Sequence, residues 1–290
     1  MSLRCPRVDD RLRPLWDFDD LDATEQRFRE QLGAEESEDG HAEVLTQLAR
    51  IEGLRGEFER ADVLADDAAA RAQSATARAR VDLERGRIRR SSGNREAARP
   101  LFESAFAGAV GGRQYFMAAD AAHMVALAAS DRDDFLEWTS RGIELADTRE
   151  TASYWLGPLL NNLGWEHYEH GEYTSALDVF ERALHARERE TENRAAIEIA
   201  RYAVGKTLRA LGRADEAIPL LETAVAWAER AGNPDGWFHE ELAEEYAAAG
   251  RPDEARGQAR LAIPLLEGAD PSFADDPERR RRLAALAEES

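Results

Sequence analysis

One pattern of small residues recurs along this chain and constrains its fold more than any other feature. A glycine is followed five residues later by an alanine and twelve residues later by another alanine. The glycines are Gly56, Gly93, Gly171, Gly212 and Gly250, and the first alanine after each is Ala61, Ala98, Ala176, Ala217 or Ala255. Similarity that returns at roughly 20 to 50 residues is typical of repeat architectures. The sequence therefore predicts an array of similar units.

Each unit reads as two helices joined by a short turn at the glycine. Seven residues before the turn stand Gly86, Gly164 and Gly205, with Ala49 and Ala243 in the other two units. Nine residues after the turn stand Ala65, Phe102, Phe180, Leu221 and Ala259. A glycine inside a helix costs about 1 kcal/mol relative to alanine, so its recurrence indicates close approach of two helices. We expect small residues to face each other across each pair.

A weaker copy of the unit lies between residues 93 and 171, with Asp131 at its turn. Residues 109–114 (AVGGRQ) are expected to form the loop before this copy. Residues 232–237 (GNPDGW) predict a turn between the last two units, because proline, aspartate and glycine favour turns.

The unit around Gly171 resembles the tetratricopeptide repeat. The positions that carry the resemblance are Leu163, Gly164, Gly171, Tyr173, Ala176, Phe180 and Ala183, whereas His167 departs from the aromatic residue usual in the family. The LNN opening and the spacing near 40 residues are most similar to the longer units of kinesin light chains. The resemblance covers about residues 42–270. It implies an all-α fold, a right-handed α-solenoid (superhelix) of about six helix-turn-helix repeats with terminal capping helices.

The ends of the chain carry helix-start signals outside the repeats. Residues 1–40 are expected to form an N-terminal arm and a capping helix, residues 41–270 the repeats, and residues 271–290 a C-terminal capping helix. Asp22 and Glu25 form a capping-box pattern before Phe28 and Leu32. Asp276 before Pro277 predicts the start of the last helix, and Leu283 and Leu286 could cover the final repeat.

Charge and composition exclude several classes of function. Net charge is −20, from 58 acidic and 38 basic residues, which argues against nucleic acid or an anionic membrane as partner. No run of about 18 apolar residues and no signal peptide is evident. Cys5 is the only cysteine, so we expect no internal disulfide and a cytoplasmic location. Lys206 is the only lysine, which indicates either a GC-rich bacterial genome or a salt-loving host.

The sequence offers little that resembles catalytic or metal-binding chemistry. His167 and His170 share a helix face, but metal sites need three or four converging ligands and the spacing is not that of zinc proteases. No nucleophile elbow or phosphate-cradling glycine loop is present. We therefore expect no enzyme activity, no cofactor and no metal. We interpret Arg279–Arg282 as a solvated face of the capping helix rather than a phosphate or partner contact, and Cys5 as incidental.

The resemblance implies that the first helix of each repeat lines an inner groove. Carried over position by position, the groove residues have cationic, aromatic and amide side chains: Arg50, Arg87, Arg90, Asn161, Trp165, Tyr168, Tyr202, Lys206, Arg209 and Trp237, with Ala121, Val125 and Ala128 from the weak unit and Glu240 and Glu244 from the last. Arginine forks suit carboxylates, and an asparagine can pair with both groups of a peptide bond. The resemblance assigns that last role to asparagines of the LNN motif.

The leading hypothesis is a non-enzymatic protein-interaction module that binds a peptide segment, acidic or C-terminal, in this groove. The alternative is a ligand- or peptide-sensing regulatory module that acts on a separately encoded effector; self-assembly of the solenoid is a further possibility. Whether the chain is a monomer or a homodimer stays open. Trp16 and Phe18 of the LWDFDD segment (15–20) are expected to pack against the first repeat. The alternative is that this segment binds a partner, or fills the groove of its own or a neighbouring chain.

Overall fold

The structure is a computed structural model that describes residues 10–189 and 193–288. Within these ranges the chain forms fifteen α-helices, two short 3-10 helices and no strand, which confirms the all-α helical repeat. The chain divides into two compact units, residues 1–159 and 160–290. The expectation about Cys5 lies outside the described residues. No described helix combines the length and the apolar character that crossing a membrane requires.

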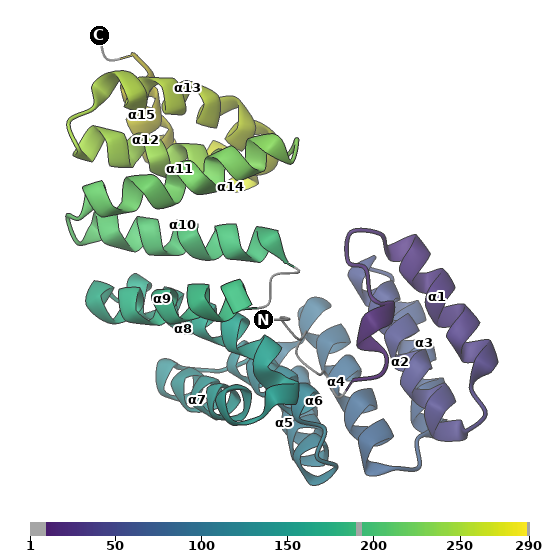
Figure 1. Cartoon of the computed structure of the whole chain (residues 1–290). Coiled ribbons are helices and arrows are strands. Elements are labelled where there is room, and N and C mark those ends of the chain that lie inside the picture. The colour runs from purple at the N-terminus through teal and green to yellow at the C-terminus, as the bar shows by residue number, and fades with distance from the viewer. Residues whose placement is uncertain (1–9, 190–192, 289–290) are drawn as a thin grey trace, which may run out of the picture. The chain divides into compact units, whose positions relative to one another are not determined.

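Unit 1 begins with an arm and one helix and continues with three helix pairs (Figure 1). The short helix η1 (Arg13–Leu15) and helix α1 (Leu21–Ala34) come first. The three pairs are α2 (Glu38–Leu54) with α3 (Phe58–Arg71), α4 (Ala75–Ser91) with α5 (Arg95–Gly111), and α6 (Tyr115–Ala126) with α7 (Arg132–Thr148). The short helix η2 (Glu150–Trp155) follows them.

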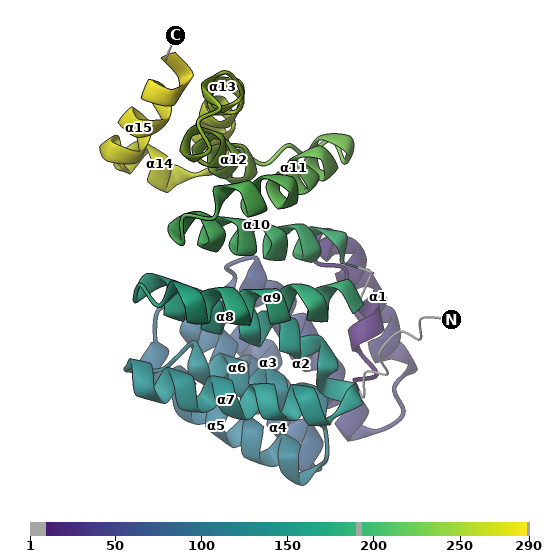
Figure 2. The same ribbon diagram turned by 60° about the vertical axis from the view of Figure 1, so that its left-hand side comes forward.

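Unit 2 contains the other three pairs and the C-terminal cap. The pairs are α8 (Leu156–Glu169, which starts at the end of unit 1) with α9 (Tyr173–Arg189), α10 (Arg194–Ala210) with α11 (Ala214–Arg230), and α12 (Gly236–Ala248) with α13 (Pro252–Ala269). Figure 2 shows the cap, α14 (Pro271–Asp275) and α15 (Pro277–Glu288), beside α13. The described residues thus hold the six pairs that the repeat pattern predicts.

The recurrent turn glycines have the backbone conformation that explains their recurrence. Gly56, Gly93, Gly171, Gly212 and Gly250 have φ angles of 82°, 90°, 73°, 72° and 72°. In this left-handed region a Cβ atom is strained, so glycine ends the first helix of a pair at least cost. At Gly171 the backbone then closes with the Glu172 amide donating to the His167 carbonyl at 2.9 Å.

The glycines inside the helices face large residues, and our expectation of small facing small is wrong at three of five pairs. A Cβ atom on Gly164 would lie 2.4 Å from the Phe180 ring, and Gly86 and Gly205 stand in the same relation to Phe102 and Leu221. The ring or branched side chain occupies the volume that the missing methyl group would take. In the first and last pairs an alanine is packed with an alanine, Ala49 with Ala65 and Ala243 with Ala259. Side-chain sizes at the two positions are therefore complementary.

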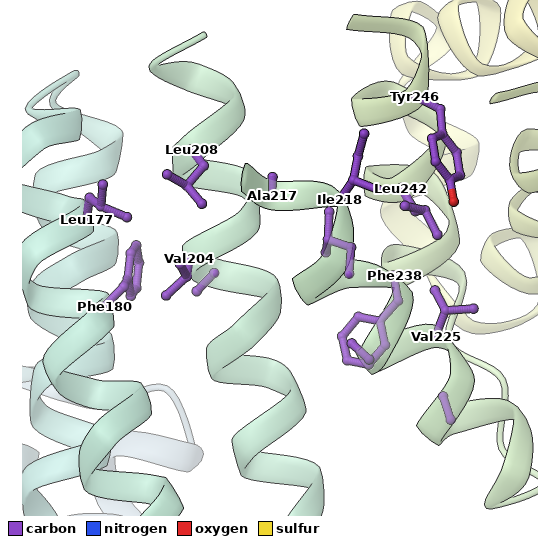
Figure 3. Packing of buried hydrophobic residues seen from close by; sticks show 14 of the residues in the cluster. Leu177, Phe180, Val204, Leu208, Ala217, Ile218, Val225, Phe238, Leu242 and Tyr246 are labelled. Atoms are coloured by element: carbon purple, nitrogen blue, oxygen red, sulfur yellow. The ribbon is translucent and has the colours of Figure 1, made fainter. Parts of the chain in front are cut away.

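The core of unit 2 runs continuously through successive pairs. Figure 3 shows Phe180 of α9 beside Val204 of α10, and Ile218 of α11 beside Phe238 and Leu242 of α12. All five side chains are buried. Each pair therefore covers its apolar face with the next, as expected for a repeat array.

The predicted helix starts agree with the structure at one end of the chain and differ at the other. Asp276 caps α15, since its carboxylate accepts from the Arg279 amide at 2.9 Å, as predicted. At the N-terminal end Asp20, not Asp22, caps α1 by accepting from the Ala23 amide at 2.9 Å. Asp22 and Glu25 instead form ion pairs with Arg55 at the end of α2. The cross-helix guanidinium competes for the carboxylates that the sequence pattern assigns to the cap.

The weak third unit is a regular helix pair. Asp131 caps α7 by accepting from the Asp134 amide at 3.0 Å, as its turn position suggests. The expected loop 109–114 is shorter, because α5 continues to Gly111 and Arg113 takes the left-handed φ of 56°. The turn predicted at 232–237 is present but ends at Asp235, which caps α12, and Gly232 has a φ of 73°.

The complementary sizes of Gly164 and Phe180 predict a measurable energetic coupling. Gly164→Ala should destabilise unit 2 by about 1–3 kcal/mol through overpacking, and Phe180→Ala by about 3–5 kcal/mol through a cavity. The double variant recreates the alanine pair of Ala243 and Ala259 and should cost less than the sum by about 1–2 kcal/mol. Urea unfolding of the four proteins measures the coupling.

Gly257→Ala is the matched control, because no atom lies within 4 Å of the added methyl group in α13. It should leave stability unchanged or raise it by up to about 1 kcal/mol. Strict additivity of Gly164→Ala and Phe180→Ala would contradict the proposed packing.

Candidate functional site

A row of aromatic side chains follows the first helices of the pairs in unit 2. Trp165 and Tyr168 on α8 lie with ring centroids 5.5 Å apart, and Trp165 lies 6.5 Å from Tyr202 on α10. Tyr202 in turn lies 5.7 Å from Phe238 on α12. The first three rings are partly exposed, whereas Phe238 is buried. The structure thus brings together three of the aromatic residues that the sequence assigned to a groove.

A pocket of about 260 Å³ opens where this row meets α12 and α15. The sequence analysis assigned six of its lining residues to the groove: Tyr202, Lys206, Arg209, Trp237, Glu240 and Glu244. The other lining residues are Glu241, from α12 like Glu240 and Glu244, and Arg279 and Arg282 from α15. All of them belong to unit 2.

The two predicted cations of the pocket are already paired with one buried carboxylate. Lys206 Nζ lies 3.1 Å from Glu241 Oε2, and Arg209 Nε lies 2.5 Å from Glu241 Oε1. Burial disfavours the charged forms, but the charges of the cations outweigh it and hold the pKa of Glu241 below its ordinary value. The same carboxylate holds the pKa of Lys206 above its ordinary range against burial. These two predicted groove cations therefore do not carry uncompensated positive charge.

Both cations nevertheless keep hydrogen-bond donors for a ligand. Lys206 uses two of its three donors, one toward Glu241 and one toward the Tyr202 hydroxyl at 3.3 Å. Arg209 makes one hydrogen bond, through Nε, within the described residues, and about a third of its side chain is exposed. Glu241 thus fixes both side chains without exhausting them.

Our interpretation of Arg279–Arg282 as a solvated run agrees with the exposure of Arg280, Arg281 and Arg282, and it is wrong for Arg279, which is partly buried. Arg279 donates to Glu240 at 2.8 and 2.5 Å and to Asp270 at 2.8 Å, and Arg282 donates to Glu244 at 2.5 Å. These two arginines stand three residues apart, and Glu240 and Glu244 stand four apart. The matched helical spacing of opposite charges is the signal that could have found them.

Glu245 is a buried acid next to the pocket that the sequence analysis missed. Both of its carboxylate oxygens are buried without a hydrogen-bond partner in the described part of the chain, and Arg209 Nε lies 3.9 Å away. Burial raises the pKa of Glu245 to about 8, and the neighbouring Glu241 carboxylate adds to the shift. The folded protein therefore keeps this group largely protonated at neutral pH.

The predicted basic residues of unit 1 are paired, covered or buried. Arg87 donates to Glu84 at 2.5 Å and also bonds Asp120. Arg50 lies 3.8 Å from Glu84 and is stacked over the rings of Trp16 and Phe18 at 5.1 and 5.4 Å. Arg90 is partly buried, and burial lowers its pKa. Ala121 and Val125 are fully buried and Ala128 is partly buried, so the weak unit offers at most Ala128 on this face.

Asn161 and the two histidines of α8 have different surroundings. Asn161 is partly exposed, and its amide makes no hydrogen bond to the described residues, so it remains available to a peptide backbone. His167 Nδ1 lies 2.5 Å from Glu172 Oε2, and His170 Nδ1 lies 2.8 Å from the Glu166 carbonyl oxygen. These are local contacts that stabilise the end of α8 and the turn after it.

Two segments match family models described as tetratricopeptide repeat, residues 159–191 and residues 199–230. The chain thus contains tetratricopeptide repeats. The matched segments correspond to the α8–α9 pair and to most of the α10–α11 pair. The matched segments contain the part of the aromatic row on α8 and α10, and Tyr202, Lys206 and Arg209 of the pocket, whereas α12 and α15 lie outside them. Similarity to kinesin light chains in particular stays a prediction.

Solved structures agree with this fold. The apo form of the quorum sensor NprR from B. thuringiensis is similar with a TM-score of 0.57 and 12% identity, over 92% of this chain and 83% of that chain. BtubC (BKLC) from P. vanneervenii is similar with a TM-score of 0.55 and 17% identity, over 77% and 91%. A tetratricopeptide repeat protein from Parabacteroides merdae has a TM-score of 0.51 and 13% identity, over 96% of each chain. No curated protein matches the sequence.

The raised pKa of Glu245 predicts how stability depends on pH. The folded state holds this proton up to about pH 8, whereas the unfolded chain releases it near the ordinary value of 4.5. The contribution of Glu245 to stability should therefore fall as the pH rises from 4.5 to 8. Glu245→Gln removes this dependence and should be more stable than the wild type by roughly 2–4 kcal/mol at pH 8.5, with little difference at pH 5.

Denaturant unfolding at the two pH values measures this difference. Glu229→Gln is the matched control, because Glu229 is an exposed carboxylate on α11. The stability of Glu229→Gln should change with pH as that of the wild type does. If the stability of Glu245→Gln also follows the wild type, the pKa of Glu245 is not raised in the folded protein.

Proposed function

We propose that this protein is a non-enzymatic interaction module that binds a peptide segment on the inner face of unit 2. The observation that carries the proposal is the single pocket to which α10, α12 and α15 each contribute charged or aromatic side chains. Helical repeats of this type generally act as interaction scaffolds, which supports a binding role rather than catalysis. A sensing module that acts on a separately encoded effector stays the alternative prediction.

The aromatic row supplies anchors for apolar side chains of the peptide. Trp165, Tyr168 and Tyr202 are partly exposed and rest on the buried core of unit 2, which fixes their positions. Tryptophan, tyrosine and arginine dominate the binding energy of many interfaces, because they bury large areas at modest entropic cost. A peptide that lies along α8, α10 and α12 would meet these rings in succession.

The polar groups favour a carboxylate on the peptide, either an acidic side chain or the C-terminus. The pocket lining has four cations against three carboxylates in a chain of net charge −20. Lys206 and Arg209 retain donors and are held in place by Glu241, so little side-chain entropy is lost on binding. The Asn161 amide, one repeat away, suits a backbone peptide group.

Lys206→Met tests the role of the pocket without unfolding it. Methionine keeps an apolar stem of similar length, and Glu241 keeps its hydrogen bond from Arg209. Peptides selected from a random library with free C-termini should bind this variant about 10- to 100-fold more weakly, measured by fluorescence anisotropy. The loss should be much smaller for versions of the same peptides that lack the carboxylate.

The matched control is Arg280→Met, which removes one positive charge from α15 outside the pocket. It should leave the affinity of the selected peptides within about twofold, because an exposed charge contributes little. Equal losses for Lys206→Met and Arg280→Met, or a library that yields no binder, would argue against a peptide site in this pocket.

A further inference from the structure

The arm of unit 1, residues 10–18, is held by side-chain contacts on α2 and α4, the first helices of the first two pairs. The Asp10 carboxylate accepts two hydrogen bonds from Arg80 on α4, each 3.1 Å long. Arg80 is almost fully buried, with 5% of its surface exposed. Leu12 is buried in the core beside Leu48 of α2. The arm thus supplies an acid and an apolar side chain to the same face.

Two aromatic rings of the arm complete this contact. The Trp16 indole donates to the Gln47 side-chain oxygen at 2.8 Å, and the ring is stacked on Phe18 with centroids 4.7 Å apart. Arg50 of α2 covers both rings. Phe18 itself is 46% exposed. The arm therefore places a carboxylate and an aromatic pair where the equivalent helices of unit 2 carry their candidate peptide site.

The fit of the arm to this face is incomplete. A cavity of about 60 Å³ remains between them, lined by charged and aromatic side chains that include Arg13, Arg50 and Glu84. Arg80 Nε and Glu84 Oε2 are buried without a hydrogen-bond partner among the described residues. The guanidinium groups of Arg13 and Arg50 make no hydrogen bond within them either. Buried polar groups without partners are costly, so the arm leaves binding capacity unused.

We propose that the arm is an internal substitute for a peptide partner and that the face beneath it, on α2, α4 and α6, is a second peptide-binding surface. The arm competes with the partner for the guanidinium group of Arg80 and for the aromatic position between Gln47 and Arg50. The proposal rests on the proposed function in one respect: both take the first helices of the pairs as the binding face. Every residue that the proposal uses lies in unit 1.

The groups in the contact define the chemistry of the partner. The partner carries a carboxylate for Arg80 and, about six residues later, an aromatic residue with a hydrogen-bond donor for Gln47, as Asp10 and Trp16 do. Its backbone fills the remaining cavity, because a peptide group offers both an acceptor for the unused guanidinium donors and a donor for Glu84. A single inorganic anion would satisfy the arginines but not the glutamate.

Competition between arm and partner follows from effective concentration. A tethered segment acts at an effective concentration on the order of millimolar, so a free copy of the arm cannot displace it at micromolar concentration. A partner that uses the donors and the acceptor left over by the arm binds more tightly than the arm and replaces it. Weakening the arm should therefore expose the surface to a free arm peptide.

The experiment uses the full chain and a fluorescein-labelled peptide of residues 9–20 as the probe. In the Asp10→Asn/Phe18→Ala variant, trypsin should cleave the Arg11–Leu12 bond about tenfold faster or more, because Leu12 must leave the core before cleavage. The labelled peptide should bind this variant and not the wild type. Adding Arg80→Gln should abolish peptide binding. Asp19→Asn is the control, since Asp19 is exposed and its carboxylate has no contact with the described face.

Three results would overturn the proposal. Cleavage at Arg11 that is no faster than in Asp19→Asn would make the arm a permanent structural element. Faster cleavage without peptide binding would show that the uncovered face does not bind peptides, as would binding that survives Arg80→Gln. If circular dichroism shows that the double variant is unfolded, trypsin cleavage and peptide binding are measured on Phe18→Ala alone, because the Phe18 ring is half exposed in the wild type. Lys206→Met should leave arm-peptide binding unchanged, which separates this surface from the site in unit 2.

Discussion

The structure depends on the close packing of two helices at one position in five of the six pairs. In these five, the residue seven places before the turn is glycine or alanine, and the residue nine places after the turn has the size that the space allows. Where glycine removes the Cβ atom, an aromatic ring or a leucine fills the gap, and where alanine keeps it, the partner is alanine. This rule fixes the distance between the helices, and with it the surface that each pair presents to the next.

A second constraint acts on charge. The chain has 58 acidic residues among 290. Several of these carboxylates lie on the first helices of the pairs. The structure pairs them across repeats: Glu241 on α12 with Lys206 and Arg209 on α10, and Glu240 on α12 with Arg279 on α15. Such pairs cost desolvation, but they orient the remaining donors of each cation. A surface built in this way is pre-organised rather than simply positive.

The features that depend on local chemistry could be predicted from the sequence. The glycine turns are one example, because a left-handed residue at a helix end is a property of the chain itself. The family frame also placed Trp165, Tyr168 and Tyr202 on one surface, where the structure brings them together. The fold class followed from the same repeats.

What could not be predicted depends on residues that meet only in space. The ring of Phe180 lies against Gly164 because of how two helices interdigitate, and spacing alone suggested a small neighbour instead. The acid that pairs with Lys206 stands 35 residues later in the chain, and it was not among the groove positions that the family frame supplied. The occupation of the first-helix face by the arm likewise depends on the buried position of Arg80, which no local pattern reveals.

The single lysine of the chain has a practical consequence, since Lys206 lies in the pocket of unit 2. Reagents that acylate primary amines can modify only this side chain and the α-amino group. Because the ammonium must lose a proton before it reacts, the bond to Glu241 slows its acylation, and a bound molecule would shield it further. The rate at which this one amine is labelled is therefore a direct chemical report on whether the pocket is occupied, with no engineered probe in the chain.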